Sequence, residues 1–597
     1  MKIKSLLIGM LACSAMVACT NTDEPEVDNG GAKGNEYYVS VAFSMPGNSS
    51  RAASLGGFES GTTNEVEVKN AIFYFLNDAG NSVANACYVP TVQGGFTWTS
   101  TQQNPTTDNV DALTNSVIVM KNPTEIPSRI VAIVNAGDLS ATSGLKPTLA
   151  QLQAVASNYA TETYTAMPAS GMVMSSTSYM DANNKLMIGA PVTAANIFES
   201  STALNKAIKE ATTDAMDEVA VVIPVEKVLA KVAVLQGENM NTTDNTLGSL
   251  TDKGATDGAA TSTTSNVTLT VSIDGWWLDS TPTQSYLLKN IDNVSVGNWW
   301  NDLANTRSYW ANSYVGTNPA QAYANDQYGQ QAALGESLYT QENTSQATTK
   351  TEQKDDTDDN VYEVNNRTKV VVAATLKNGN TAVDLVKWYG NYYTKDGFLI
   401  SLANLNDVKK YYTKSGETYS SLTSAKLKIV SNGDKALTEG STQTPEIGTG
   451  NQDNITVNGT AIRNYEAVAV LNLAEGEKLY TLTVENGTQK ATEVTNLDAV
   501  NEELKKISKV QYWNGGKTYY YVEIEHNTVD ATTYFGVVRN HLYKLTLERI
   551  KGLGTPVPNP DKIIIPEKPG DSYSETYISA KIEILAYKVV SQSVTLQ

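Results

Sequence analysis

The chain has 597 residues, too many for one hydrophobic core, so we expect two or more domains. It carries 44 Lys and Arg residues against 63 Asp and Glu residues, a formal net charge of −19, and 41% of its residues are hydrophobic. The negative charge excludes nucleic acid as an expected partner, because a phosphate-binding surface needs positive charge.

The N-terminus has the features of a bacterial lipoprotein signal peptide. Lys2 and Lys4 precede an apolar stretch at residues 6–11, and small residues then lead to an Ala-Cys step at Cys19. We therefore predict a signal peptide over residues 1–18 and lipidation of Cys19, with Cys13 as a poorer competing site. An acidic, Gly/Asn-rich tether follows Cys19. No later stretch approaches the ~20 apolar residues of a membrane span.

The first predicted strand lies directly upstream of a predicted protease site. Its apolar side chains alternate along the chain and are Tyr37, Val39, Val41, Phe43 and Met45. Arg51-Ala52 follows in a Ser/Gly-rich segment that we expect to be exposed to proteases. Cleavage after Arg51 would remove residues 19–51, a propeptide that contains this strand, and would leave an apolar groove open.

Short strand-like segments bounded by turn residues fill residues 52–236 and predict an N-terminal β-domain. Residues 237–265 are rich in Thr, Asn, Asp, Gly and Ser and predict a linker or a long loop. A second β-rich block covers residues 266–555. A few short helices are expected among the strands, one of them at residues 148–159, so the predicted fold is mostly all-β.

The C-terminus, residues 556–597, predicts a Pro-rich arm followed by strand material at residues 577–597. The apolar side of its period-two pattern consists of Ile578, Ala580, Ile582, Ile584, Val590, Val594 and Leu596. Such a strand could fill the groove of a neighbouring copy by β-strand addition. The two ends of the chain together predict a polymer.

Catalytic and metal-binding patterns are weak in this sequence. The only histidines, His526 and His541, lack the spacing of metal ligands, and residues 515–518 lack the first glycine of a phosphate loop. Cys87 is the only cysteine beyond the leader and tether, so we expect a small buried side chain and no intrachain disulfide. The aspartates at residues 355–359 lack calcium-loop spacing and predict a solvated loop. We predict no enzyme activity, no cofactor and no metal site.

Tryptophans in the second block offer an alternative function. A stacking surface for sugar rings could be formed by Trp276, Trp277, Trp299, Trp300 and Trp310. In that case the protein would be an outer-membrane surface lipoprotein that binds glycans without polymerising. We favour core and inter-sheet packing for these side chains. A glycan-binding lipoprotein of this kind would need neither a spare strand nor a processing site.

Several segments resemble the fimbrillins that build type V pili in Bacteroidales, the FimA and Mfa group of major fimbrial subunits. The resemblance is carried by the leader with Arg51-Ala52 after a first strand, and by residues 223–235, 339–344 and 534–556. The last segment is the most specific and is closest to the Mfa type. It combines Gly536, Arg539, Asn540, His541 and Tyr543 with Gly552, Gly554 and Pro556.

The resemblance implies two tandem transthyretin-like β-sandwich domains with long loops, in a lipoprotein exported to the outer membrane. An arginine-specific protease would cut after Arg51 and so release the lipid anchor, and subunits would then join by donor-strand exchange into a homopolymer. This stalk would reach the cell surface with accessory tip and anchor subunits and would support adhesion. Ala586-Tyr587 stands where the resemblance leads us to expect a tryptophan-bearing strand, which leaves the donor register open.

Overall fold

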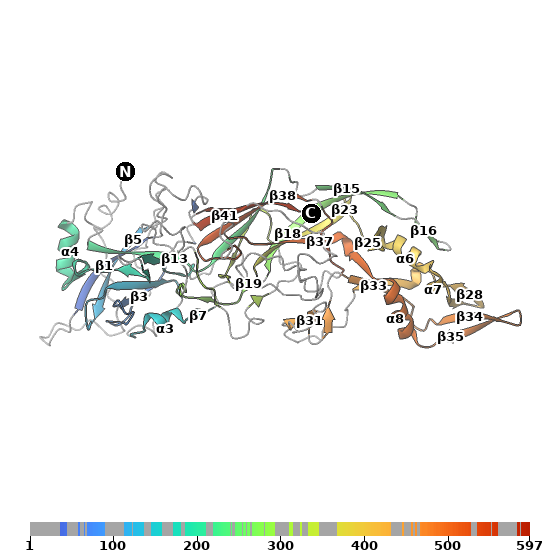
Figure 1. Ribbon diagram of the computed structural model, residues 1–597, viewed down its shortest axis with the longest axis horizontal. Coiled ribbons are helices and arrows are strands. Elements are labelled where there is room, and N and C mark those ends of the chain that lie inside the picture. Colours follow the sequence, from blue (N-terminus) through green and yellow to red (C-terminus); the bar gives the residue numbers. More distant parts are fainter. Residues whose placement is uncertain are drawn as a thin grey trace.

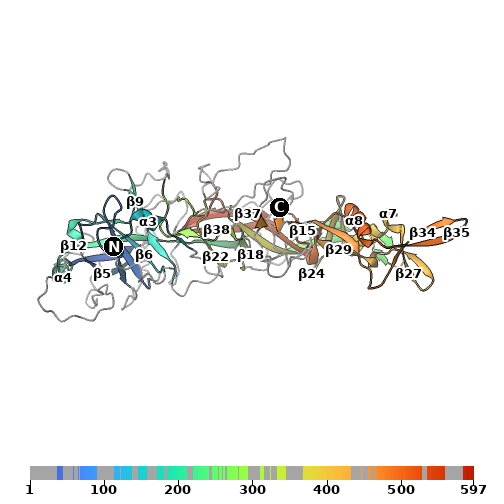
Figure 2. The ribbon, with the colours of Figure 1, turned by 90° about the horizontal axis from the view of Figure 1, so that it is seen from below.

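The described part of the chain forms an elongated molecule in which an N-terminal, a central and an inserted unit follow one another along the long axis (Figure 1; Figure 2). The largest hydrophobic cluster of each unit is separate from those of the other two. Strands make up most of its elements, so the predicted all-β fold is confirmed. The described helices are α3 (Leu149–Gln153), α4 (Ser201–Glu210), α6 (Lys395–Ala403), α7 (Asn406–Lys409) and α8 (Leu497–Ile507). None of these described helices has the length and apolar character of a membrane span.

The computed structural model describes residues 36–44, 58–59, 65, 68–89, 113–121, 123–136, 145–157, 171–180, 185–210, 219–238, 240, 245–252, 255–257, 260–262, 265–279, 281–292, 310–314, 323–324, 332–344, 367–431, 445–446, 455–457, 460–462, 466–526, 534–550, 552–558, 582–585 and 587–596.

The N-terminal domain is built on a sheet with buried residues on both faces. Its strand order is β12 (Ile197–Phe198), β1 (Glu36–Ser44), β13 (Ala220–Lys227), β8 (Met174–Ser176), β6 (Arg129–Val134), β3 (Ala71–Leu76) and β4 (Cys87–Val89), with β5 (Leu113–Lys121) on β1 and β11 (Ala190–Pro191) on β6. Successive side chains of a strand point to opposite faces. In β3, Phe73 and Phe75 accordingly join one core cluster, whereas Ile72 and Tyr74 join another.

Cys87 is 2% exposed, as predicted for a small buried side chain. It is also disulfide-bonded in the structure, which corrects the expectation that no intrachain disulfide forms. That expectation counted Cys13 and Cys19 as removed or lipidated, whereas the full-length chain still carries both. These two cysteines lie outside the described residues.

The central domain is a sandwich of two sheets around a shared core. One sheet has the order β2 (Phe58–Glu59), β41 (Tyr587–Leu596), β40 (Ile582–Leu585), β38 (His541–Ile550), β14 (Ala230–Gln236) and β22 (Ser337–Thr340). The other has the order β15 (Asn245–Asp252), β18 (Ser265–Asp279), β23 (Lys369–Asn378), β37 (Lys517–Glu523) and β39 (Thr555–Pro556), with β24 (Thr381–Ala382) on β23. Val232 and Leu545 of the first sheet share a core cluster with Leu269 and Val372 of the second.

The structure moves the predicted boundary between the first two domains. β13 belongs to the N-terminal sheet and β14 to the central sheet, so the chain crosses between them at Val228-Leu229 rather than at residue 236. The prediction of a linker at 237–265 is also corrected, because this stretch contains β15, which pairs antiparallel with β18. β15 lies at the margin of its sheet, and such a strand can form without a dense apolar pattern.

The adjacent tryptophans of β18 are both buried, on opposite faces. Trp276 is 0% exposed in the central core, and Trp277 packs with Tyr519 and Val557 on the other face. The predicted arm therefore does not begin at residue 556, since β39 pairs with β37 and Val557 is buried. Pro556 is tolerated there because β39 is the last strand in the described order of its sheet, where a missing N–H costs little.

A third unit is inserted between β23 and β37, in addition to the two predicted domains, and lies at the end of the molecule opposite the N-terminal sheet (Figure 1). One of its sheets contains β26 (Asn391–Thr394), β25 (Leu385–Trp388), β36 (Val510–Trp513), β33 (Glu466–Leu471) and β29 (Leu427–Ser431). The other contains β28 (Thr418–Ser421), β27 (Tyr411–Ser415), β34 (Leu479–Glu485) and β35 (Thr488–Val494). Val500 and Leu504 of the amphipathic helix α8 join its core.

Short strand pairs complete the described elements. They are β9 (Ser178–Met180) with β10 (Leu186–Ile188), β7 (Ala156–Ser157) with β20 (Ser285–Tyr286), β16 (Ala255–Asp257) with β17 (Ala260–Ser262), β19 (Thr281–Pro282) with β21 (Tyr323–Ala324), and β30 (Pro445–Glu446) with β31 (Ile455–Val457) and β32 (Thr460–Ile462).

Candidate functional site

The strand that we predicted to be removable, β1, lies inside the N-terminal sheet. One edge pairs antiparallel with β5 along its whole length, from Glu36 to Ser44. The other edge pairs with β12 at Tyr38 and Val39 and then runs parallel to β13 from Ser40 to Ser44. Both edges of β1 are thus occupied, and its loss would separate β5 from β13.

The buried side of β1 matches the predicted apolar stripe where it is described. Val39 and Val41 are 0% and 1% exposed, and both belong to the core cluster with Ile118 of β5 and Ile223 of β13. Tyr37 is partly buried and packs against the same cluster. Phe43 belongs to β1 by its backbone.

Several predicted site residues lie outside the described residues. They are Cys19, Met45, Arg51, Ala52, Ile578 and Ala580.

The C-terminal segment forms two strands rather than the single long strand suggested by its pattern. β40 and β41 pair antiparallel, with Ile582 opposite Ser591 and Ile584 opposite Val589. Of the predicted donor residues, Ile582 and Ile584 lie on β40, whereas Val590, Val594 and Leu596 lie on β41. We call residues 582–596 the C-terminal hairpin.

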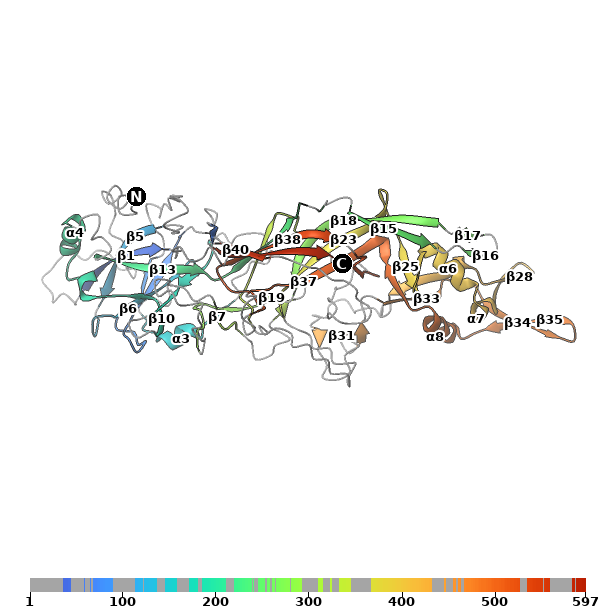
Figure 3. The ribbon, with the colours of Figure 1, turned by 45° about the horizontal axis from the view of Figure 1, so that its top comes forward.

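The C-terminal hairpin is paired with the central sheet of its own chain, beside β38 (Figure 3). β40 runs antiparallel to β38, with Ile582 opposite Leu545. Farther along, β41 runs parallel to β38, with Leu596 opposite Ile550. The segment that we predict as the donor therefore occupies a place in its own subunit in the uncleaved chain.

A short strand after the predicted cleavage site meets this hairpin. In β2, Phe58 pairs with Lys588 and Glu59 pairs with Tyr587, at the start of β41. Nothing in the local sequence of β2 indicated this pairing, because two residues are too few for a periodic signal.

Glu65 fixes the chain a few residues beyond β2. Its carboxylate is buried, with Oε1 2.9 Å from Lys231 Nζ, and it accepts a hydrogen bond of 2.6 Å from the Tyr339 hydroxyl. Burial alone would raise the pKa of this carboxyl group, but the nearby ammonium groups of Lys227 and Lys231 hold the pKa at about 2. Glu65 is therefore ionised and anchored to the central sheet at neutral pH.

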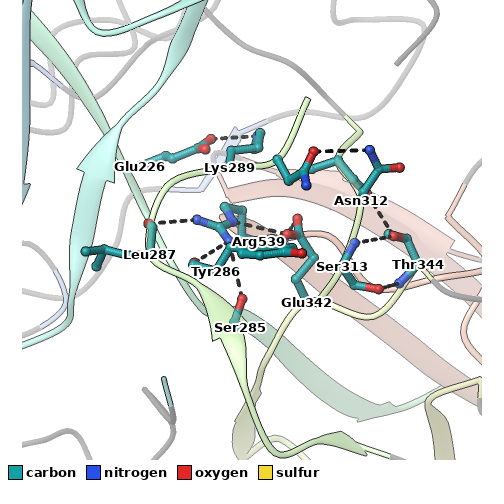
Figure 4. A network of polar contacts seen from close by, with 12 residues as sticks. Glu226, Ser285, Tyr286, Leu287, Lys289, Asn312, Ser313, Glu342, Thr344 and Arg539 are labelled. Atoms are coloured by element: carbon teal, nitrogen blue, oxygen red, sulfur yellow. Dashed lines mark hydrogen bonds and ion pairs between the residues drawn. The ribbon is translucent and has the colours of Figure 1, made fainter. Parts of the chain in front are cut away.

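A buried polar network joins the N-terminal and central domains (Figure 4). Arg539 is 0% exposed, and its Nε donates to Glu342 Oε2 at 3.3 Å. Its terminal nitrogens donate to the backbone carbonyls of Tyr286 at 2.7 Å and Leu287 at 3.2 Å. Because Tyr286 pairs with β7 of the N-terminal half, this arginine connects β38 to that half of the molecule.

A second buried ion pair lies beside Arg539. Lys289 Nζ is 2.9 Å from Glu226 Oε2, and Glu226 belongs to β13. Burial lowers the pKa of the Lys289 ammonium, against the opposing effect of Glu226. The backbone N–H of Asn540 also donates to the carbonyl of Leu229 at 3.0 Å. The sheet that contains β1 and the sheet that contains the C-terminal hairpin are thus joined by buried contacts.

The two histidines, which the sequence offered as candidates for chemistry, make structural contacts. His526 Nδ1 lies 2.8 Å from the Tyr543 hydroxyl, and His541 Nδ1 lies 2.7 Å from the Arg539 carbonyl oxygen. Residues 514–516 form a single turn, with Gly515 at a φ of 58°, between β36 of the inserted unit and β37 of the central sheet, so they make neither a phosphate loop nor the hairpin turn that the sequence suggests. Within the described residues, no group of three or more His, Cys, Asp or Glu side chains could hold a metal ion. The aspartates at 355–359 lie outside those residues.

Comparisons with known proteins identify the C-terminal region. Residues 511–593 match the family model described as "Major fimbrial subunit protein type IV, Fimbrillin, C-terminal". This stretch contains β37, β38 and β40 and most of β41. A comparison with curated proteins gives no match.

Solved structures that match this chain in a structural comparison include two fimbrial proteins. The tip fimbrial protein Mfa3 from Porphyromonas gingivalis, with C-terminal truncation, is 9% identical with a TM-score of 0.28, over 94% of this chain and 100% of that chain. A fimbrial assembly protein from Parabacteroides distasonis ATCC 8503 is 11% identical with a TM-score of 0.25, over 58% of this chain and 87% of that chain. These scores are low, so the assignment depends on the family model. The C-terminal region of the chain, residues 511–593, thus matches the fimbrillin family.

Proposed function

We propose that this protein is a structural subunit of a cell-surface fimbria that polymerises by donor-strand exchange and supports adhesion. It would be exported as a lipoprotein whose lipid, attached to Cys19, holds it at the outer membrane. An arginine-specific protease would release it by cutting between Arg51 and Ala52. Its partners would be further copies of itself, with accessory tip and anchor subunits at the fibre ends.

The placement of β1 is the observation that carries this proposal. β1 precedes Arg51 in the chain and is paired along both edges, and Val39 and Val41 are buried in the core. Removal of β1 would leave unpaired backbone groups on β5 and β13 and an apolar floor between them, and both are costly in water. A cleaved subunit therefore needs a replacement strand.

Removal of β1 would leave a slot between β5 and β13, and the C-terminal segment has the alternating apolar pattern that a strand in this slot requires. Its predicted donor residues alternate along the chain, so one face of an extended strand would be apolar. Burial of about five such side chains contributes roughly 1.5–3 kcal/mol each, an upper estimate near ~10 kcal/mol before ordering costs. Backbone pairing with β5 and β13 would add to this, and the joint between two subunits would be long-lived.

The glycan-binding alternative has no supporting observation among the described residues. Trp276 and Trp277 are buried in core clusters on the two faces of β18, so neither offers a ring to a ligand. Trp310 is only partly exposed and packs against His526, and Trp299 and Trp300 lie outside the described residues.

The proposed function is tested by Arg51→Ala in the full-length chain. Treatment of the wild-type protein with an arginine-specific protease is expected to give a new N-terminus at Ala52 and a ladder of oligomers on a denaturing gel of unheated samples. Arg51→Ala is expected to give neither. Lys33→Ala, which removes a basic site upstream of β1, is the matched control and should polymerise like the wild type. Polymers of uncleaved Arg51→Ala protein would contradict the proposal.

A further inference from the structure

We propose that β2 is a latch that keeps the C-terminal hairpin on its own subunit until the chain is cut. The inference rests on the proposed function and adds a second consequence to the cut after Arg51. The cut would open the β1 slot of a subunit and would also release the strand that the same subunit donates to a second copy of this chain.

The latch is placed at the outer edge of the C-terminal hairpin. In the described sheet order, β2 flanks β41, β41 flanks β40, and β40 flanks β38. Phe58 and Glu59 pair with the first two residues of β41, Lys588 and Tyr587. An uncovered strand edge is a template for pairing with another chain. β2 thus covers the donor where a second copy would begin to pair.

β2 is held in place from both sides along the chain. Upstream, β1 is fixed by pairing on both of its edges as far as Ser44. Downstream, Glu65 is fixed by its ion pair with Lys231 and by the hydrogen bond from Tyr339. A pairing of two residues is too short to persist by itself in water. It persists here because the chain on each side is anchored, which keeps the effective concentration of β2 at the edge of β41 high.

Arg51 lies between the upstream anchor and the latch. After the cut, β2 would be tethered only through Glu65, on a free N-terminal end that starts at Ala52. The entropic cost of keeping Phe58 and Glu59 on β41 would rise, and the edge of β41 would open. The precursor is protected in two ways by this arrangement, since β1 fills its slot and β2 covers the first two residues of the donor edge of β41.

If β2 is a latch, an uncleaved subunit without it should donate its C-terminal strand but be unable to accept a strand from another copy. If the pairing of β2 were broken without the cut, β1 would still fill the slot, while the hairpin would be held only by β38 and could open more readily to enter the slot of a cleaved copy. Such a precursor would join a growing fibre at one end and stop further growth there.

The double variant Phe58→Pro/Glu59→Pro breaks the pairing, because proline has no backbone N–H to donate. Phe58→Ala/Glu59→Ala is the matched control, since it changes the same side chains and keeps both N–H groups. Fluorescently labelled, uncleaved precursor of each kind is mixed with polymerising, cleaved wild-type protein. The measurements are the label incorporated into fibres and the deuterium exchange of residues 587–596 in the precursor.

The proline precursor is expected to incorporate at least tenfold more label than wild-type precursor, to shorten the fibres and to exchange faster over residues 587–596. The alanine control should behave like the wild type. The latch would be overturned if all three precursors showed equal incorporation and equal exchange while the cleaved wild-type protein still polymerised. That result would leave the proposed function standing. Failure of the cleaved wild-type protein to polymerise would instead overturn the proposed function and the latch with it.

Discussion

The two ends of the chain are held in their sheets in different ways. β1 lies between β5 on one edge and β12 and β13 on the other, with buried valines beneath it. The C-terminal hairpin lies beside β38, and the outer edge of β41 is covered at its first two residues by β2. One end is thus an interior strand, and the other is a hairpin near the margin of a sheet.

The two ends of the chain would therefore leave their sheets by different routes. β1 can leave only if its backbone hydrogen bonds on both edges and the burial of its side chains are lost together. Because that loss is too costly for thermal opening, we expect the release of β1 to depend on a covalent cut followed by replacement. The C-terminal hairpin can leave by opening its pairing with β38 and the short pairing with β2. We therefore expect proteolysis to make the acceptor and local opening to supply the donor.

The largest expected effect is that of a charge on the donor. Val594→Asp is expected to reduce polymerisation of cleaved protein more than a hundredfold, because an unpaired carboxylate in an apolar slot costs several kcal/mol. Thr595→Asp lies on the other side of the period-two pattern and is the matched control, expected to polymerise at nearly the wild-type rate. The rate is followed by light scattering after protease addition. Equal loss in both variants would contradict the assigned donor face.

A charge on β1 is expected to destabilise the precursor but not the mature subunit. Val41→Asp is expected to lower the free energy of unfolding of the uncleaved chain by about 4–5 kcal/mol, through the burial of an unpaired charge. Fibres made from it should match wild-type fibres, because residue 41 has been removed. Val221→Asp on β13, which is buried beside it and stays after cleavage, should destabilise both forms. Denaturant unfolding of precursors and fibres is the measurement, and Val41→Asp fibres as weak as Val221→Asp fibres would refute removal of β1.

The sequence predicted those elements whose residues carry a strong local pattern. The alternating apolar residues of β1 and the strand material at the C-terminus were recognisable from period two alone. The division of this segment into β40 and β41 was missed because Ile584, Ala586 and Val590 all lie on even-numbered positions, so the pattern that suggests one strand continues from β40 into β41.

Other features could not be predicted, because they depend on partners far along the chain. β15 is poor in apolar residues and exists through its pairing with β18. The inserted unit between β23 and β37 looks, in sequence, like more strands of the same domain, and only its separate core distinguishes it. Arg539 and Glu342 are separated by 197 residues, and no local pattern brings them together.

The buried contact between the N-terminal and central domains is tested at Arg539. Arg539→Leu is expected to lower the free energy of unfolding by about 3–5 kcal/mol, because it leaves Glu342 buried without its ion-pair partner. Arg549→Ala, at an exposed arginine on β38, the strand that follows Arg539, is the control and should change stability by less than about 0.5 kcal/mol. Urea unfolding measures both. Similar small effects would mean that the buried network does not hold the two sheets together.

The smallest expected effect concerns the anchor beyond β2. The pKa of the Glu65 carboxyl group is lowered from 4.5 to about 2 in the folded chain, so its ionised form contributes about 3 kcal/mol of stability above pH 4.5. This contribution is lost as the pH falls from 4.5 to 2, because the unfolded state then takes up a proton before the folded state does. Glu65→Gln has no such group.

The difference in unfolding free energy between wild type and Glu65→Gln should therefore narrow by about 3 kcal/mol between pH 4.5 and pH 2. Glu238→Gln, which removes an exposed carboxylate just after β14, is the control and should keep the pH dependence of the wild type. Urea unfolding at a series of pH values gives the comparison. A constant difference across this range would mean that Glu65 is not the anchor, and the chain between β1 and the central sheet would then be fixed at only one end.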